Sequence, residues 1–185
     1  GKGTEWEGLY TGGLDKKYVQ VANIDLSGYS EGKGWAPIGN SSYWDNNPFT
    51  GSFDGNGYKI TGLIIDGSET VGLFGSTQRA TIENVALEDI NVKGGNYTGG
   101  LVGKAISSTI TNSYATGEVT GGELTGGLVG WAHNSTRITN SCATGSVTGE
   151  GDTGGLVGFA TSAIKITNSY ATGSVTGGDN TGGLV

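Results

Sequence analysis

Apolar residues occur along this chain in short groups separated by glycine and small polar residues. Near the end of the chain they occupy residues 156–159, 164–166 and 170–175, among Gly, Asn, Asp and Ser. None of these groups reaches the roughly 10 to 12 residues that a helix needs, and their β-branched side chains favour extended strands. The pattern therefore predicts an all-β protein built from short strands.

The groups recur with a period of about 28 residues. The tetrad Gly-Leu-(Val or Phe)-Gly, truncated in its last copy, begins at Gly72, Gly100, Gly127, Gly155 and Gly183. A second phrase, Ile-Thr-Asn-Ser, keeps the same period, beginning at Ile110, Ile138 and Ile166. Two phrases in one register indicate a repeat architecture, in which each unit buries its apolar face only against its neighbours.

The length of the repeat selects among repeat folds. A propeller blade needs about 40 residues for its four strands. A leucine-rich repeat fits the length, but its leucine spacing is missing. About three strands of five residues, each followed by a short turn, return the chain above its start and form a flattened triangle. We predict an all-β, right-handed parallel β-helix (β-solenoid) with about 28 residues per repeat.

This fold places equivalent residues of successive coils on one another. Inside the solenoid we expect two ladders, one of leucine and one of isoleucine: Leu101, Leu128, Leu156; Ile110, Ile138, Ile166. At a turn we expect an asparagine ladder that satisfies amide groups which would be costly to bury: Asn84, Asn112, Asn140, Asn168. At the corners, glycines such as Gly126 and Gly127 are expected to supply positive φ and room for close backbone approach.

The chain divides by composition into an irregular part and a regular part. Residues 1–59 hold three of the four Trp and both Pro, so we interpret them as an aromatic-rich N-terminal cap with the first irregular coils. Residues 60–185 are the repeats, truncated at the C-terminal end, and we expect them to belong to a longer array. Because "ITGLII" from Ile60 aligns with "IENVAL" from Ile82, a step of 22, the early coils are expected to be shorter.

Composition and charge limit the partners. Glycine makes up 38 of the 185 residues, charged residues are 15 %, and the net charge is −7 without any run of Lys or Arg. We therefore expect no nucleic-acid partner. No apolar run approaches the roughly 18 residues of a membrane span, so we expect no membrane insertion in this fragment. The single Cys142 excludes an internal disulfide.

The repeated phrases resemble a known family. "TGGLVG" with "ITNSYATGSVTG", preceded by "WAPIGN" and "FTGSFDGNGYKITGLII", is similar to the GLUG-motif repeat region of bacterial secreted and cell-surface proteins, which are adhesin-like and in some cases immunoglobulin A1 peptidases. The resemblance covers residues 71–185. It implies an extracellular, cell-surface or secreted β-helical module of a bacterial protein, outside any catalytic domain, whose partner is an unidentified glycan or protein on a host or bacterial surface.

Candidate catalytic and metal-binding residues are few. Nucleophilic catalysis would need Cys142 beside His133, the only imidazole, but we expect Cys142 in a core stack and His133 in a solvated loop. The carboxylates are scattered, so we predict no enzyme. The best polar cluster is Asp54 with Asn56 in "FDGNGYK". Its spacing suggests a calcium-binding loop, although the bidentate Glu of such a loop is missing. A turn containing residues in the left-handed conformation explains the same sequence. We otherwise expect no cofactor.

Two surface features keep alternative functions open. Trp35, Tyr43 and Trp44 could form a sugar-stacking platform, although such aromatics more often plug the end of a solenoid. Outward threonines in register would be needed for an ice-binding solenoid: Thr111, Thr139, Thr167; Thr120, Thr148, Thr176. The favoured prediction is a non-catalytic repeat module acting in adhesion or as a stalk or spacer; the alternatives are a carbohydrate-binding or carbohydrate-active β-helix and an ice-binding solenoid.

Overall fold

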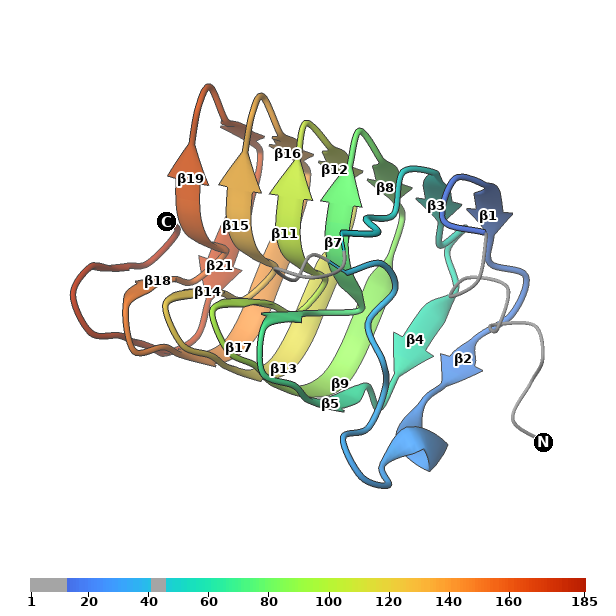
Figure 1. The fold of residues 1–185 in the computed structure, drawn as a ribbon, viewed down its shortest axis with the longest axis horizontal. Coiled ribbons are helices and arrows are strands. Elements are labelled where there is room, and N and C mark those ends of the chain that lie inside the picture. The colour runs from blue at the N-terminus through green and yellow to red at the C-terminus, as the bar shows by residue number, and fades with distance from the viewer. Residues whose placement is uncertain (1–12, 41–45) are drawn as a thin grey trace.

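The fold is a parallel β-solenoid. A computed structural model describes residues 13–40 and 46–185, and Figure 1 shows its coils stacked along one axis. In the described residues, every named pair of strands is parallel, and the strands belong to four sheets that run along that axis. The predicted all-β solenoid with a spacing of about 28 residues is confirmed.

The first two sheets, A and B, hold the strands that follow one another across the Ile-Thr-Asn-Ser phrase. Sheet A contains β1 (Lys17–Val19), β3 (Ser52–Asp54), β8 (Thr81–Glu83), β12 (Thr109–Thr111), β16 (Arg137–Thr139) and β20 (Lys165–Thr167). Sheet B contains β2 (Ile24–Asp25), β4 (Lys59–Thr61), β5 (Ile64–Asp66), β9 (Ala86–Lys93), β13 (Tyr114–Thr120), β17 (Cys142–Thr148), β21 (Tyr170–Thr172) and β22 (Val175–Thr176). The short 3-10 helix η1 (Ser27–Tyr29) follows β2.

The other two sheets, C and D, flank the Gly-Leu-Val-Gly tetrad. Sheet D contains β6 (Thr70–Val71), β10 (Tyr97–Gly99), β14 (Leu124–Gly126), β18 (Asp152–Gly154) and β23 (Thr181–Gly182). Sheet C contains β7 (Phe74–Gln78), β11 (Val102–Ile106), β15 (Val129–His133) and β19 (Val157–Thr161), which stand side by side in Figure 1. One regular coil, such as β10 to β13, thus has four strands, whereas the sequence pattern predicted three.

The early coils are longer than predicted, not shorter. Ile60 pairs with Leu87 and not with Ile82, which pairs instead with Phe53. The step of 22 is wrong because it aligns apolar residues that belong to two different sheets. In the first coil Tyr18 pairs with Phe53, a step of 35. Between β2 and β3 the described residues contain the short helix η1 and no further strand. In the described part of the chain, the parallel sheets therefore start at β1, and the expected boundary at residues 59 and 60 falls inside β4.

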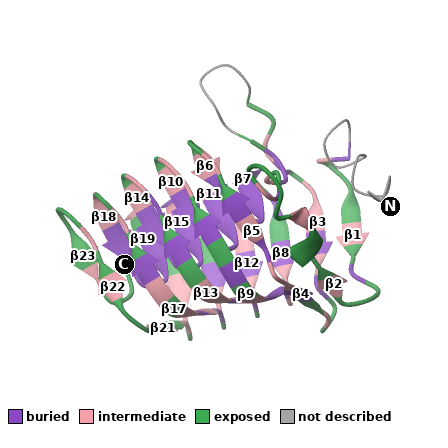
Figure 2. Cartoon of the chain, turned by 90° about the horizontal axis from the view of Figure 1, so that it is seen from below, coloured by how far each residue is buried: buried purple, intermediate pink, exposed green. Residues whose placement is uncertain are grey.

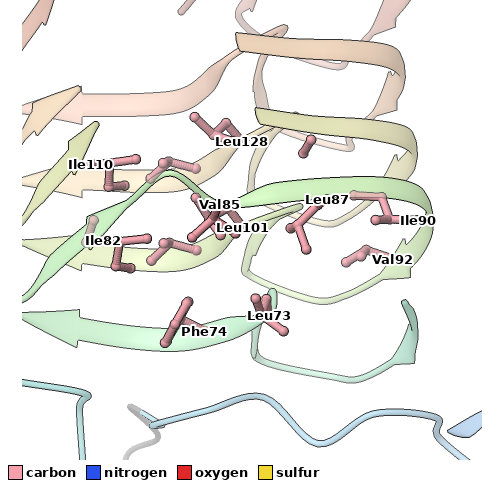
Figure 3. Packing of buried hydrophobic residues seen from close by; sticks show 14 of the residues in the cluster. Leu73, Phe74, Ile82, Val85, Leu87, Ile90, Val92, Leu101, Ile110 and Leu128 are labelled. Atoms are coloured by element: carbon pink, nitrogen blue, oxygen red, sulfur yellow. The ribbon is translucent and has the colours of Figure 1, made fainter. Parts of the chain in front are cut away.

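The apolar core fills the space that the coils enclose (Figure 3). Leu101, Leu128 and Leu156 are each 0 % exposed. Ile110 pairs with Ile138 and Ile138 with Ile166. Burial of each such side chain stabilises the fold by about 1.5 to 3 kcal/mol. Ile166 is only partly buried, and Figure 2 shows buried positions along β11, β15 and β19 giving way to exposed ones at the last strands.

Glycine at the tetrad allows the coils to approach closely. A Cβ added to Gly127 would clash with the carbonyl oxygen of Gly155, one coil further on. The expected positive φ is wrong for these glycines, since neither Gly126 nor Gly127 has it. Positive φ occurs instead at Gly117, Gly145 and Gly173, which share one register position in sheet B.

Candidate functional site

The asparagines in register lie where the chain turns from sheet A to sheet B. Each has a φ of 50° to 55°, a left-handed conformation that asparagine tolerates better than other side chains. The side-chain amide of each later asparagine donates to the Oδ1 of the preceding one, at 3.3, 3.1 and 3.3 Å for the pairs Asn112–Asn84, Asn140–Asn112 and Asn168–Asn140. The four amides thus form a continuous hydrogen-bonded row along the axis.

This row lies on the surface and not in a buried turn as expected. Asn112, Asn140 and Asn168 are exposed. The buried groups of the same corner are satisfied by serine: the backbone N–H of Ser113 donates to Oγ of Ser141 at 3.2 Å, and the Ser113 hydroxyl donates to the carbonyl oxygen of Thr111 at 2.9 Å. Sequence reasoning missed this serine row, although the fourth letter of Ile-Thr-Asn-Ser carried the signal.

Asp54 and Asn56 lie at the start of the amide row. Oδ1 of Asp54 accepts hydrogen bonds from the backbone N–H of Asn56 at 2.8 Å and from Nδ2 of Asn84 at 2.9 Å. The first bond makes an Asx turn, and Asn56 and Gly57 both have positive φ. Within residues 13–40 and 46–185, no three His, Cys, Asp or Glu side chains lie close enough to hold a metal ion. The Asx turn and the two positive φ values make the letters Asp-Gly-Asn-Gly a projecting turn, in which Asn56 and Gly57 are exposed.

A second polar group crosses three strands of sheet B. Glu88 on β9 accepts a hydrogen bond of 2.6 Å from the Tyr114 hydroxyl on β13 and forms an ion pair of 2.9 Å with Nζ of Lys59 on β4. The hydrogen bond from Tyr114, followed by that from Lys59, lowers the pKa of the Glu88 carboxyl. Burial, together with the Glu88 carboxylate, raises the pKa of Tyr114 to about 12. At neutral pH, Glu88 is therefore ionised and Tyr114 remains a hydrogen-bond donor.

Trp35 does not fit the expected sugar-stacking platform, because its ring is buried. Only 4 % of the residue is exposed, and its ring meets that of Tyr29 edge to face at 5.4 Å between centroids. Tyr43 and Trp44, the other two expected residues, lie outside the described part of the chain. Phe49, Phe53 and Phe74 pack in the same end of the solenoid, with the Phe49 and Phe74 ring centroids 5.1 Å apart.

His133 is not a solvated loop residue, contrary to expectation. It ends β15 and is half-buried, its ring centroid lies 4.9 Å from that of Trp131, and its Nδ1 is 2.9 Å from the Thr161 hydroxyl. The other side of this cluster is Tyr97, whose ring stacks on Trp131 at 5.4 Å. These three rings come from two adjacent sheets, and each of the residues is half-buried.

Cys142 pairs with Tyr114 and Tyr170 in sheet B, as its place in the repeat predicts. It is half-buried and lies outside the core, since this position faces outward from the sheet. His133 belongs to sheet C, where its ring contacts Trp131 and the Thr161 hydroxyl. The thiol and the imidazole that nucleophilic catalysis would need thus come from different sheets, and the imidazole has other partners.

The threonine rows follow the expected register. Thr111, Thr139 and Thr167 pair along sheet A, and Thr120, Thr148 and Thr176 pair along sheet B. In sheet A the outward position two residues earlier changes from Thr109 to Arg137 and then to Lys165. These charged side chains interrupt the flat hydroxyl surface that an ice-binding array would need.

Comparison with known proteins finds the GLUG motif at residues 94–120, 121–148 and 149–176. The chain is 38 % identical over 124 residues to halomucin of the archaeon Haloquadratum walsbyi; the match covers 63 % of the chain and 1 % of halomucin. It is 39 % identical over 72 residues to a protein of Evansella cellulosilytica named as a putative Gly-rich membrane protein. This match covers 36 % of the chain and 8 % of that protein. No solved structure matches.

The motif coincides with the structural unit. Residues 94–120 contain β10 to β13, which make one complete coil, and the next two copies contain β14 to β17 and β18 to β22. The chain spans only a small part of the two relatives, one of which is archaeal, so the similarity extends beyond bacteria. Residues 94–176 of this chain are three consecutive GLUG-motif repeats, each forming one coil of the solenoid.

Proposed function

We propose that this chain is a non-catalytic, extracellular repeat module of a surface protein, acting as a stalk or spacer that also presents surface for adhesion. The observation that carries the proposal is the continuation of the parallel sheets along the axis, with a one-residue register shift between β9 and β13. Four parallel sheets and the asparagine row continue from coil to coil. Such an array behaves as a stiff rod whose length is proportional to the number of repeats.

The comparisons support a surface role in outline. Halomucin and the Gly-rich membrane protein are both far longer than the matched region, as expected for a module that is one part of a long chain. Among the described residues, no helix has the length and hydropathy to span a membrane. Charged residues are only 15 % of the sequence, and two rows along the sheets are threonine: Thr111, Thr139, Thr167; Thr120, Thr148, Thr176.

The spacer role is tested by changing the number of coils. One extra copy of residues 121–148 should lengthen the particle by about 4.8 Å, the spacing between adjacent strands, and should leave the fold intact. Small-angle scattering of variants with one, two and three extra copies measures this length. A maximum dimension that does not grow with copy number would contradict the stiff-rod proposal.

Adhesion is tested by displaying the chain on cells that lack it and measuring their attachment to glycan-coated and protein-coated surfaces. The matched control is the same display with residues 121–148 deleted, which removes one coil but keeps the ends. A stalk alone predicts no attachment from either variant.

A further inference from the structure

A recess opens on the outer surface of sheet B, where β4, β9 and β13 lie side by side (Figure 1). Its volume is about 370 Å³, within the usual range for small-molecule sites. It is lined by Asn56, Gly57, Lys59, Asn84, Val85, Ala86, Asn112 and Tyr114. A stalk requires no hollow at this place.

A small residue between two large ones creates the recess. Lys59, Ala86 and Tyr114 are consecutive in one row across sheet B, so the side chains of Lys59 and Tyr114 start from strands roughly 9 to 10 Å apart, which is two strand spacings. Ala86, of which 9 % is exposed, forms a small apolar floor, while the side chain of Val85 packs in the core beneath it. The projecting turn at Asn56 and Gly57 raises the wall on the N-terminal side.

Polar groups stand at two sides of this floor. On one side are the amides of Asn84 and Asn112, which are joined by the 3.3 Å hydrogen bond of the asparagine row. Each amide has a second N–H and further lone pairs beyond the bonds of the row. On the other side are Lys59 and Tyr114. Both bind the carboxylate of Glu88, which lies outside the lining and holds the two walls in place.

This combination suits a sugar ring better than other ligands. The tyrosine ring, with the Ala86 methyl group, matches the C–H face of a pyranose, and the two amides and the Lys59 ammonium group match its hydroxyl rim. A bare cation would find no carboxylate among the lining residues. Glu88, beside them, already holds a lysine, and Asp54 already accepts hydrogen bonds from Asn56 and Asn84. A peptide strand could not add to the sheet, because β9 is paired on both sides, with β4 and β13.

We propose that this recess binds one neutral hexopyranose unit of a glycan. This inference rests on the proposed extracellular, adhesive role and makes it more specific, because a chain outside the cell meets the glycans of other surfaces. The expected affinity of one sugar is weak, with a Kd of about 1 mM or higher, since a small open site provides few contacts.

The experiment is an amide-shift titration of the ¹⁵N-labelled chain with the methyl hexopyranosides of glucose, galactose and mannose. At least one of the three should shift the amides of Asn84, Ala86 and Tyr114 in a saturable way. Ala86→Tyr should weaken this binding at least about tenfold by filling the recess. The fold should accept the change, because tyrosine occupies the same row at Tyr114 and Tyr170. Tyr170→Ala is the matched control and should bind as the unchanged chain does.

Glu88→Gln supplies a second variant that keeps the side-chain shape and breaks the ion pair, and it should weaken binding by about threefold or more. The proposal is overturned if none of the three sugars shifts these amides, if the shifts map to another surface, or if Ala86→Tyr binds normally. The amide shifts are measured on the isolated chain, whereas adhesion is measured by the attachment of cells that display it. A failure of the adhesive proposal and a failure of this one are therefore separate results.

Discussion

The isoleucine row provides a sharp test of how neighbouring coils stabilise one another. Ile138 lies between Ile110 and Ile166 and is 0 % exposed. Ile138→Ala removes three carbon atoms, which costs about 2.4 kcal/mol in transfer free energy at about 0.8 kcal/mol each. The cavity left between two coils adds to this, so we expect a total loss of about 3 to 4 kcal/mol in the free energy of unfolding.

Ile166→Ala is the matched control, because the residue occupies the same row in the sequence Lys-Ile-Thr instead of Arg-Ile-Thr. Ile166 is only partly buried, so the same truncation should cost roughly half as much, about 1.5 kcal/mol. Urea unfolding followed by far-ultraviolet circular dichroism measures both values. Equal losses for the two variants would refute the conclusion that the following coil supplies the difference.

Two further predictions concern close approach and pH. Gly127→Ala places a Cβ against the carbonyl oxygen of Gly155 and should prevent normal stacking of the coils. Gly183→Ala is the control, because its Cβ meets open space and the variant should fold normally. A thermal melt distinguishes the two variants, and equal midpoints would contradict the reasoning. Tyr114, whose pKa is raised to about 12, should contribute stability that is complete below the unfolded pKa of about 10 and is lost as pH rises to about 12. Comparing unfolding at several alkaline pH values for the unchanged chain and Tyr114→Phe checks the sign, and an identical pH dependence in the two proteins would count against it.

The sequence by itself determined the repeat, the strand character and the ladders' registers. A period of 28 with apolar groups too short for helices leaves few folds other than stacked coils, and residues that recur at that period must lie on one another once the coils stack. For this reason the repeat alone predicts that Leu101, Leu128 and Leu156 share one buried row. The three GLUG copies lie in this same regular part.

The same reasoning could not predict the strand pairing of the irregular N-terminal coils. Their pairing depends on which sheet each strand joins, and Ile60 looks equally suited to Ile82 and to Leu87 when only apolar letters are compared. The sequence also did not determine which side chains at the turn between sheets A and B face the solvent. The asparagine row was expected to serve a buried turn, yet the left-handed backbone points those amides outward and leaves the buried positions to Ser113 and Ser141.

Only the tertiary structure decided where a ligand-sized space exists. A recess arises from the sizes of Lys59, Ala86 and Tyr114, which are far apart in the sequence and become neighbours only through the pairing of three strands. Likewise, the sequence left open whether Trp35 belongs to a surface platform or plugs the end of the solenoid, and in the folded chain it is covered. The period of the sequence specifies which residues stack, because residues one period apart occupy the same place in successive coils. The shape of the surface depends instead on residues that depart from the repeat. The neighbours of those residues are known only once the whole chain has folded.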